Sequence, residues 1–208
     1  MTPSVNLRSC GVTLAWLFHT LAAHPTVEAQ LHAELDHVLG KRMPTAADLP
    51  TLPYLKQVIE ETLRRYPAAY LSTRQSIAAD EICGYAIPAK SIVLINIYGL
   101  HHHPDYWADP VRFDPDRFAP TGAQANNHDA YLPFLLGPRK CIGEPLAHLE
   151  MALITETVAQ RFRLRADPTR PAKLTTKFTL RAQGGLWMIP EARSAHPEQS
   201  AAQHLAHA

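Results

Sequence analysis

Apolar residues recur at helical spacing in three successive segments of the first third of the chain. The first, mostly apolar segment ends near His24-Pro25, because proline disfavours helix in the residue before it. The second has an apolar stripe over residues 27–38 and is followed by Gly40, a typical C-terminal cap. The third lies between Pro53, which can begin a helix, and Pro67, which stops one. We therefore predict three helices before residue 67.

The hydrophobic period changes after residue 69, where β-branched and aromatic residues gather in short runs. These runs predict a small sheet with strands at 70–77, 82–87 and 91–97, and a turn at Pro88-Ala89-Lys90. Near the end of the chain, residues 176–181 and 186–189 flank Gln183-Gly184-Gly185 and predict a closing hairpin.

Proline density sets the middle of the chain apart, since seven of the eighteen prolines lie in residues 101–150. This density excludes long regular elements before Cys141 and indicates a long, packed, irregular segment, which usually serves a site. Residues 191–208 are small and polar and predict a disordered tail. A fourth helix is predicted from about Ile142 to Phe162, with Leu146, Leu149, Leu153 and Val158 on one face.

Composition narrows the class of protein. With 208 residues, 46% of them hydrophobic, the chain can bury the core of one large domain or two small ones. A net charge of +1 provides no field that would attract nucleic acid, so we expect no nucleic-acid partner. No apolar run reaches the ~18 residues of a spanning helix, so we expect no membrane segment in this chain. Three cysteines favour a reducing compartment, and we expect Cys10 and Cys83 to pack as small apolar residues.

Residues 1–29 have an alternative interpretation as a secretory signal, because Arg8 precedes an apolar stretch and small residues lie near Ala29. Cleavage there would leave a secreted binding protein. His19 and His24 interrupt the stretch, and the helical periodicity continues beyond Ala29, so we favour an intact helix.

The most informative residues surround Cys141, which lies between Gly137 and Gly143 directly before the fourth predicted helix. The positive end of that helix and the neighbouring Arg139 and Lys140 favour thiolate over thiol. The glycines allow the backbone to turn and to approach a ligand closely. A single thiolate without Cys or His neighbours is a poor zinc or iron–sulfur ligand set, but it suits an axial ligand of haem iron.

This segment resembles the haem-binding signature of the cytochrome P450 family, which it matches at every defined position. Glu61-Thr62-Leu63-Arg64 resembles the family's Glu-x-x-Arg helix, and Pro115-Asp116-Arg117-Phe118 resembles the segment that follows it. The resemblance runs from about Val12 to Ile189. It implies an α+β fold, mainly α with small β-sheets, that forms the C-terminal half of a P450 domain within residues 1–190. The matching signature positions are Phe134, Gly137, Arg139, Cys141 and Gly143.

The resemblance implies haem b as the cofactor, with Cys141 as the ligand of its iron. It further implies that Glu61, Arg64 and Arg117 form a buried salt-bridged triad that holds the cysteine loop in place. One carboxylate that accepts two guanidinium groups would satisfy donors that are costly to bury alone. Arg74, in the first strand after the Glu-x-x-Arg helix, and Arg139 resemble the family arginines that pair with the haem propionates.

The chain also departs from the family pattern. It has about half the length of a complete member and lacks most of the residues that form the distal pocket. The family's acid–alcohol pair, which delivers protons during oxygen activation, falls at Arg8-Ser9, so a cation replaces the acid and Ser9 is the only matching hydroxyl. The triplet His101-His102-His103 does not indicate a metal site, because adjacent side chains on extended chain point to opposite faces.

Two functional hypotheses follow from the resemblance. In the first, the chain is a fragment or one part of a haem-thiolate monooxygenase, which inserts one atom of O2 into a small organic substrate. A ferredoxin or flavin reductase would supply the electrons, and a cytoplasmic location is the default. In the second, the chain is a truncated, non-catalytic P450 remnant that binds haem weakly or not at all.

Overall fold

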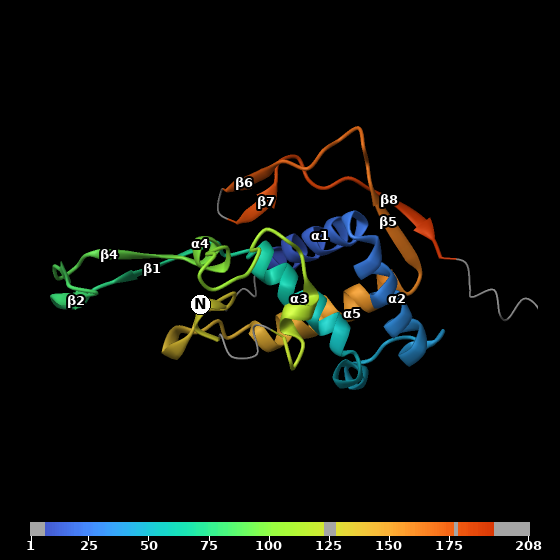
Figure 1. Cartoon of the computed structure of the whole chain (residues 1–208), viewed down its shortest axis with the longest axis horizontal. Coiled ribbons are helices and arrows are strands. Elements are labelled where there is room, and N and C mark those ends of the chain that lie inside the picture. The colour runs from blue at the N-terminus through green and yellow to red at the C-terminus, as the bar shows by residue number, and fades with distance from the viewer. Residues whose placement is uncertain (1–6, 123–127, 177–178, 194–208) are drawn as a thin grey trace, which may run out of the picture.

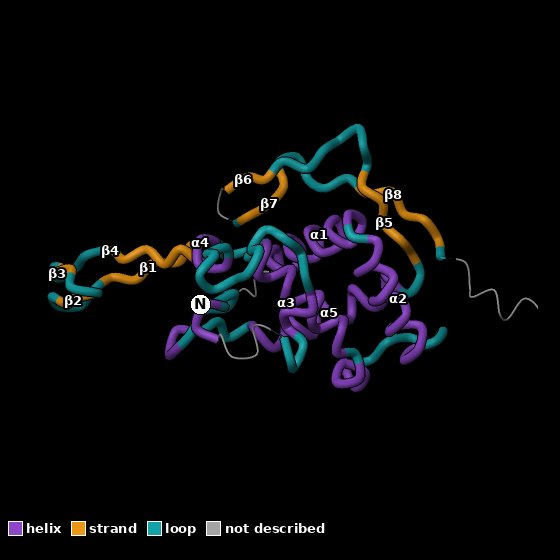
Figure 2. Tube along the Cα trace, viewed as in Figure 1, coloured by secondary structure: helices purple, strands orange, loops and turns teal. Residues whose placement is uncertain are grey.

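A computed structural model describes residues 7–122, 128–176 and 179–193 of the chain. Its helices occupy the centre of the molecule and its strands lie at the edges (Figures 1 and 2). The predicted α+β class, with helices dominant and small antiparallel sheets, is confirmed. The α-helices are α1 (Leu7–Ala23), α2 (Pro25–Leu39), α3 (Pro53–Arg65), α4 (Ile97–His101) and α5 (Glu144–Ala159). Short 3₁₀ helices are η1 (Ala46–Thr51), η2 (Pro115–Phe118), η3 (His128–Ala130) and η4 (Gly137–Arg139).

The hydrophobic core lies among α1, α2, α3 and α5, which pack around one another. Leu17, Leu31 and Val58 come from three different helices and are each fully buried. Helix α1 is therefore an integral part of this core. No helix among the described residues is both long enough and apolar enough to span a bilayer.

The start of α3 shows how local sequence and tertiary contact combine. Pro53 begins the helix at a position where no backbone N–H is needed. The Glu34 carboxylate of α2 then accepts the next two amide hydrogens, from Tyr54 at 2.7 Å and from Leu55 at 2.8 Å. This contact places α3 against α2, with the Glu-x-x-Arg residues on the buried side.

The predicted sheet after residue 69 is instead two separate two-stranded ladders. Strand β1 (Leu71–Gln75) pairs with β4 (Ile92–Asn96), and β2 (Asp80–Ile82) pairs with β3 (Tyr85–Ile87). The expected single strand over 82–87 is wrong, because Cys83 and Gly84 both have positive φ and turn the chain between β2 and β3. The thiol of Cys83 is consequently exposed, not packed as expected, whereas Cys10 is half-buried. Together the two ladders form an extended hairpin, residues 71–96, that projects from the helical centre of the molecule (Figure 1).

The C-terminal strands pair differently from the prediction. Strand β5 (Phe162–Ala166) pairs with β8 (Met188–Ala192), and β6 (Leu174–Thr176) pairs with β7 (Leu180–Ala182). The expected hairpin between 176–181 and 186–189 is therefore wrong. Strand β8 also includes residues 191 and 192, so the predicted disordered tail does not begin at 191; residues 194–208 lie outside the described part of the chain.

Helix α5 begins and ends two to three residues inside the predicted range. Its expected apolar face is also wrong, since Leu146 is exposed and Leu149, Leu153 and Val158 are half-buried. The face that enters the core consists of Met151, Ala152, Thr155, Glu156 and Ala159.

Candidate functional site

Glu61 and Arg64 form a fully buried pair on one face of α3. The guanidinium group donates from Nε to Oε2 and from Nη2 to Oε1, each at 2.7 Å. The Nε of Arg117, from η2, lies 3.6 Å from Glu61 Oε1, and the backbone N–H of Asp114 donates to the same oxygen at 3.0 Å. The structure thus brings Glu61, Arg64 and Arg117 together around one carboxylate.

The two arginines also satisfy the backbone of the irregular segment. Arg64 donates to the carbonyl oxygens of His101 at 2.8 Å, Pro110 at 3.0 Å and Arg112 at 3.2 Å. Arg117 donates to the carbonyl oxygen of Asp109 at 2.9 Å and to that of Ala108. Buried carbonyl groups without partners are costly, so these bonds allow a chain without regular structure to pack against α3.

The cysteine loop is a tight reversal of the chain between Phe134 and Cys141. The Cys141 N–H donates to the Phe134 carbonyl oxygen at 2.9 Å, and the Lys140 N–H donates to that of Gly137 at 3.0 Å. Gly137 has a φ of 73°, a conformation that glycine adopts without strain. Leu135, two residues earlier, also has a positive φ of 64°, and its N–H donates to the Leu132 carbonyl oxygen at 3.2 Å. These turns return the chain to the start of α5.

The Cys141 side chain is exposed, and the following Ile142 is completely exposed. Gly143 is the N-cap of α5, and a Cβ built there would lie 3.8 Å from the Cys141 sulfur, an ordinary contact distance. Burial and the neighbouring Glu150 raise the pKa of the Cys10 thiol of α1 to about 11. The exposed thiols are thus those of Cys83 and Cys141 among the three cysteines.

The remaining predicted site residues lie outside the buried triad. Arg74, on β1, is exposed and donates to the Ser72 hydroxyl at 3.2 Å and to the Thr73 carbonyl at 2.8 Å. Arg139, in η4, is exposed. Ser9 is half-buried near the start of α1, where its carbonyl oxygen accepts the Thr13 hydroxyl at 3.2 Å.

Sequence reasoning missed His101, which ends α4 and is fully buried. The triplet was expected on extended chain, whereas His101 lies in the last turn of a helix. Its ring bonds the Arg64 carbonyl oxygen at 3.1 Å and the Leu132 N–H at 2.8 Å. Nothing in the local sequence distinguishes it from His102 and His103, because only the approach of the irregular segment buries it.

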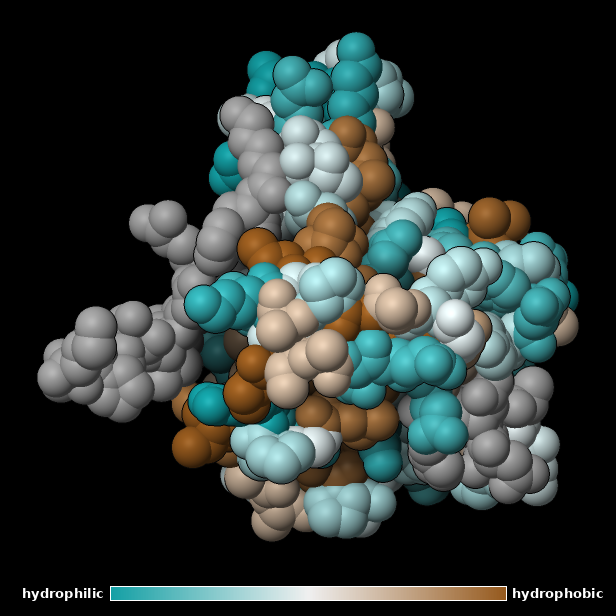
Figure 3. Space-filling view, turned by 90° about the vertical axis from the view of Figure 1, so that its left-hand side faces the viewer, coloured by the Kyte–Doolittle hydropathy of each residue, from teal (hydrophilic) through white to brown (hydrophobic). Residues whose placement is uncertain are grey.

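The residues around Cys141 fit a haem better than a bare metal ion. Within the described ranges there is no group of three or more His, Cys, Asp or Glu side chains that could hold a metal ion. One exposed sulfur suits an iron whose other ligands come from a porphyrin. Figure 3 shows hydrophobic residues between hydrophilic ones on the side of the molecule from which β1 and β4 extend. Leu71, Leu136 and Ile142 are large apolar residues with exposed side chains.

Comparison with known proteins agrees with this geometry. The family model for cytochrome P450 matches residues 10–189, and the chain belongs to that family, which uses haem b as its cofactor. The chain is 46% identical to cyclooctat-9-en-7-ol 5-monooxygenase of Streptomyces melanosporofaciens over 75% of its length and 34% of the relative's. It is 42% identical to cyclooctatin synthase of the same organism, over 90% of this chain and 41% of the relative. Mouse leukotriene-B4 omega-hydroxylase 3 is 37% identical over 88% of this chain and 35% of its own length. The chain thus spans about a third to two fifths of these relatives.

Proposed function

We propose that this chain binds haem b with the Cys141 thiolate as the ligand of its iron, and that it forms the proximal part of a P450 monooxygenase. The observation that carries the proposal is the exposed Cys141 sulfur, presented by a tight loop directly before helix α5. Bound haem would supply the oxidation chemistry, with a thiolate ligand that favours O–O bond cleavage.

The chain's own residues would hold and orient that group. Phe134 begins the cysteine loop and Gly137 turns it, while Gly143 follows the loop as the N-cap of α5. Arg74 and Arg139 are exposed cations that would pair with the two propionates. The triad of Glu61, Arg64 and Arg117 would keep the loop in place through the backbone that it satisfies.

Substrate and partners are proposed from the relatives. The matched proteins are named for oxidation of cyclooctat-9-en-7-ol and leukotriene B4, so we propose a largely apolar organic substrate for this chain. A ferredoxin or flavin reductase would supply electrons, in the cytoplasm. Ser9 would contribute the hydroxyl near the site of oxygen activation, with the acidic partner replaced by Arg8.

The test is carbon-monoxide difference spectroscopy of the purified chain after addition of haem and reduction. The proposal predicts the red-shifted absorption band of a thiolate-ligated haem, and Cys141→Ser should abolish it. Cys83→Ser is the matched control, because Cys83 is also exposed but lies in the turn between β2 and β3. A spectrum of free haem in all three proteins would contradict the proposal and favour the non-catalytic remnant.

A further inference from the structure

We propose that His101 is a positioning residue for the cysteine loop: its imidazole joins the C-terminal end of α3 to Leu132, where the chain enters that loop. One ring nitrogen, Nδ1, lies 3.1 Å from the Arg64 carbonyl oxygen. The other, Nε2, accepts the Leu132 N–H at 2.8 Å. The ring is thus a two-ended connection between the buried triad and the loop that carries Cys141.

The two contacts determine the tautomer of His101. A backbone N–H can only donate, so Nε2 must be the unprotonated nitrogen, and Nδ1 must carry the hydrogen that reaches the Arg64 carbonyl. Burial lowers the pKa of His101 to about 3, so the imidazole stays neutral. Only a neutral imidazole can donate at one end and accept at the other.

The surroundings hold the ring in this orientation. The Arg64 guanidinium donates to the His101 carbonyl oxygen at 2.8 Å, while the His101 ring bonds the Arg64 carbonyl oxygen, so the two residues contact each other reciprocally. Tyr131 stacks on the imidazole with ring centroids 5.3 Å apart. Trp107 meets it edge-on at 6.3 Å. A fully buried ring with these neighbours has little freedom to turn.

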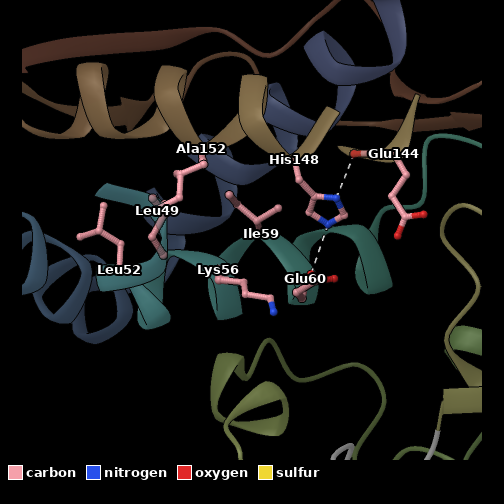
Figure 4. A pocket seen from close by; sticks show the side chains of 9 residues that line it. Leu49, Leu52, Lys56, Ile59, Glu60, Glu144, His148 and Ala152 are labelled. Atoms are coloured by element: carbon pink, nitrogen blue, oxygen red, sulfur yellow. Dashed lines mark hydrogen bonds and ion pairs between the residues drawn. The ribbon is translucent and has the colours of Figure 1, made fainter. Parts of the chain in front are cut away.

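A second connection from α3 reaches the other side of Cys141. Glu60 accepts the Tyr131 hydroxyl at 2.5 Å, and its other carboxylate oxygen lies 3.2 Å from Nε2 of His148 on α5. Figure 4 shows the His148 ring between Glu60 and the backbone of Glu144, whose carbonyl oxygen is 3.1 Å from Nδ1. Helix α3 therefore contacts the chain after the cysteine loop through His148, and before it through two neighbouring residues, Tyr131 by Glu60 and Leu132 by way of His101.

The consequence for ligation rests on the proposed function, whereas the connection itself does not require haem. Loss of the His101 contact would free the Leu132 amide and allow the loop entrance to move. In the haem-bound chain, this movement would reduce the share of haem held by the thiolate. The two effects have separate measurements, so failure of one is distinguishable from failure of the other.

The experiment compares three substitutions in the full chain. His101→Gln places an acceptor near the former Nε2 and can keep the Leu132 bond, whereas His101→Asn places a donor near the former Nδ1 and can keep only the Arg64 bond. His101→Ala removes both. His37→Asn, at an exposed position of α2, is the control for replacing a histidine. Hydrogen exchange of the Leu132 amide is measured without haem, and the thiolate-type carbon-monoxide band is measured with haem.

We expect His101→Ala and His101→Asn to speed exchange at Leu132 about tenfold or more, whereas His101→Gln and His37→Asn stay near the wild-type rate. With haem, the fraction of haem that gives the thiolate-type band should fall in His101→Ala and His101→Asn and stay near the wild-type value in His101→Gln and His37→Asn. Equal exchange at Leu132 in the Gln and Asn variants, or wild-type exchange in His101→Ala, would overturn the proposal. Absence of the thiolate band in the wild type would count against the proposed function, while the exchange result would still decide the role of His101.

Discussion

Glu61 on α3 and Glu156 on α5 are both fully buried, but their surroundings are opposite. Glu61 accepts two bonds from Arg64 and one from the Asp114 N–H, with Arg117 beside it. Neither carboxylate oxygen of Glu156 has a hydrogen-bond partner among the described residues.

This difference shows that burial alone does not decide what a charge contributes to the fold. Near Glu156, the Arg42 guanidinium is already bonded to Asp48, so it does not reach the Glu156 carboxylate. Burial and the nearby Asp48 charge raise the pKa of Glu156 to about 7. The carboxylate of Glu61 holds irregular backbone in place, whereas ionisation of the Glu156 carboxylate lowers the free energy of unfolding.

The largest effect should come from breaking the satisfied region. Arg64→Met would leave the Glu61 carboxylate without its closest cation and would remove a hydrogen-bond donor from three carbonyl oxygens. We expect a loss of roughly 3–5 kcal/mol in the free energy of unfolding, measured by urea denaturation at pH 7. Arg65→Met, at the next position, is the control and should cost much less. Similar losses in the two variants would show that the triad has no special role in stability.

The second test relieves the unsatisfied carboxylate. Because the pKa of Glu156 is raised in the folded chain, its ionisation costs stability that begins above the unfolded pKa of about 4.5 and grows until about pH 7. Glu156→Gln should therefore stabilise the chain by roughly 2–3 kcal/mol at pH 8 and by little at pH 4. Urea denaturation at both pH values measures this. The exposed Glu81→Gln should show no such pH dependence, and a gain for Glu156→Gln that is equal at both pH values would refute the explanation.

The third test concerns the half-buried ion pair of Glu60 and His148, whose charges are paired but only partly shielded from water. Burial opposes both charges, but the hydrogen bond and charge of the partner outweigh it, so the pKa of His148 is raised and that of Glu60 is lowered. The Glu60 contribution is present above the unfolded pKa of about 4.5, and the His148 contribution is present below about 6.5. His148→Gln should cost about 1 kcal/mol near pH 5.5, and the cost should shrink above the raised His148 pKa and below the lowered Glu60 pKa. A cost that is constant from pH 3 to 9 would contradict this.

The smallest effect is expected at the exposed arginines. Arg74→Ala and Arg139→Ala remove charges that water already solvates, so the melting temperature of the haem-free chain should change by no more than about 2 °C. Haem titration should nevertheless show weaker binding if these residues pair with the propionates. A stability loss comparable to that of Arg64→Met would show that one of them is structural.

Much of the site could be predicted because its signals are local. Pro53 and Pro67 bound α3, since proline lacks the N–H that a helix interior requires. The three-residue spacing of Glu61 and Arg64 places both on one helix face. The cysteine between two glycines before a helix likewise needs only a few neighbouring residues to be recognised.

The errors fall where distant segments decide the outcome. The sequence predicts that residues 176–181 pair with residues 186–189, whereas β8 pairs with β5 in the structure. The partner of a strand depends on packing throughout the chain, which a local pattern does not contain. The buried face of α5 depends on the helices against which it packs.

The sequence by itself therefore determined the family, the order of the main helices, and the position of the cysteine loop before α5, because short-range backbone constraints and residue spacing encode them. Only the tertiary structure decided that His101 would be buried between Arg64 and Leu132, that Glu156 would have no hydrogen-bond partner within the described part of the chain, and which strands would pair. Those properties arise from contacts between segments many residues apart, whose geometry no local pattern contains.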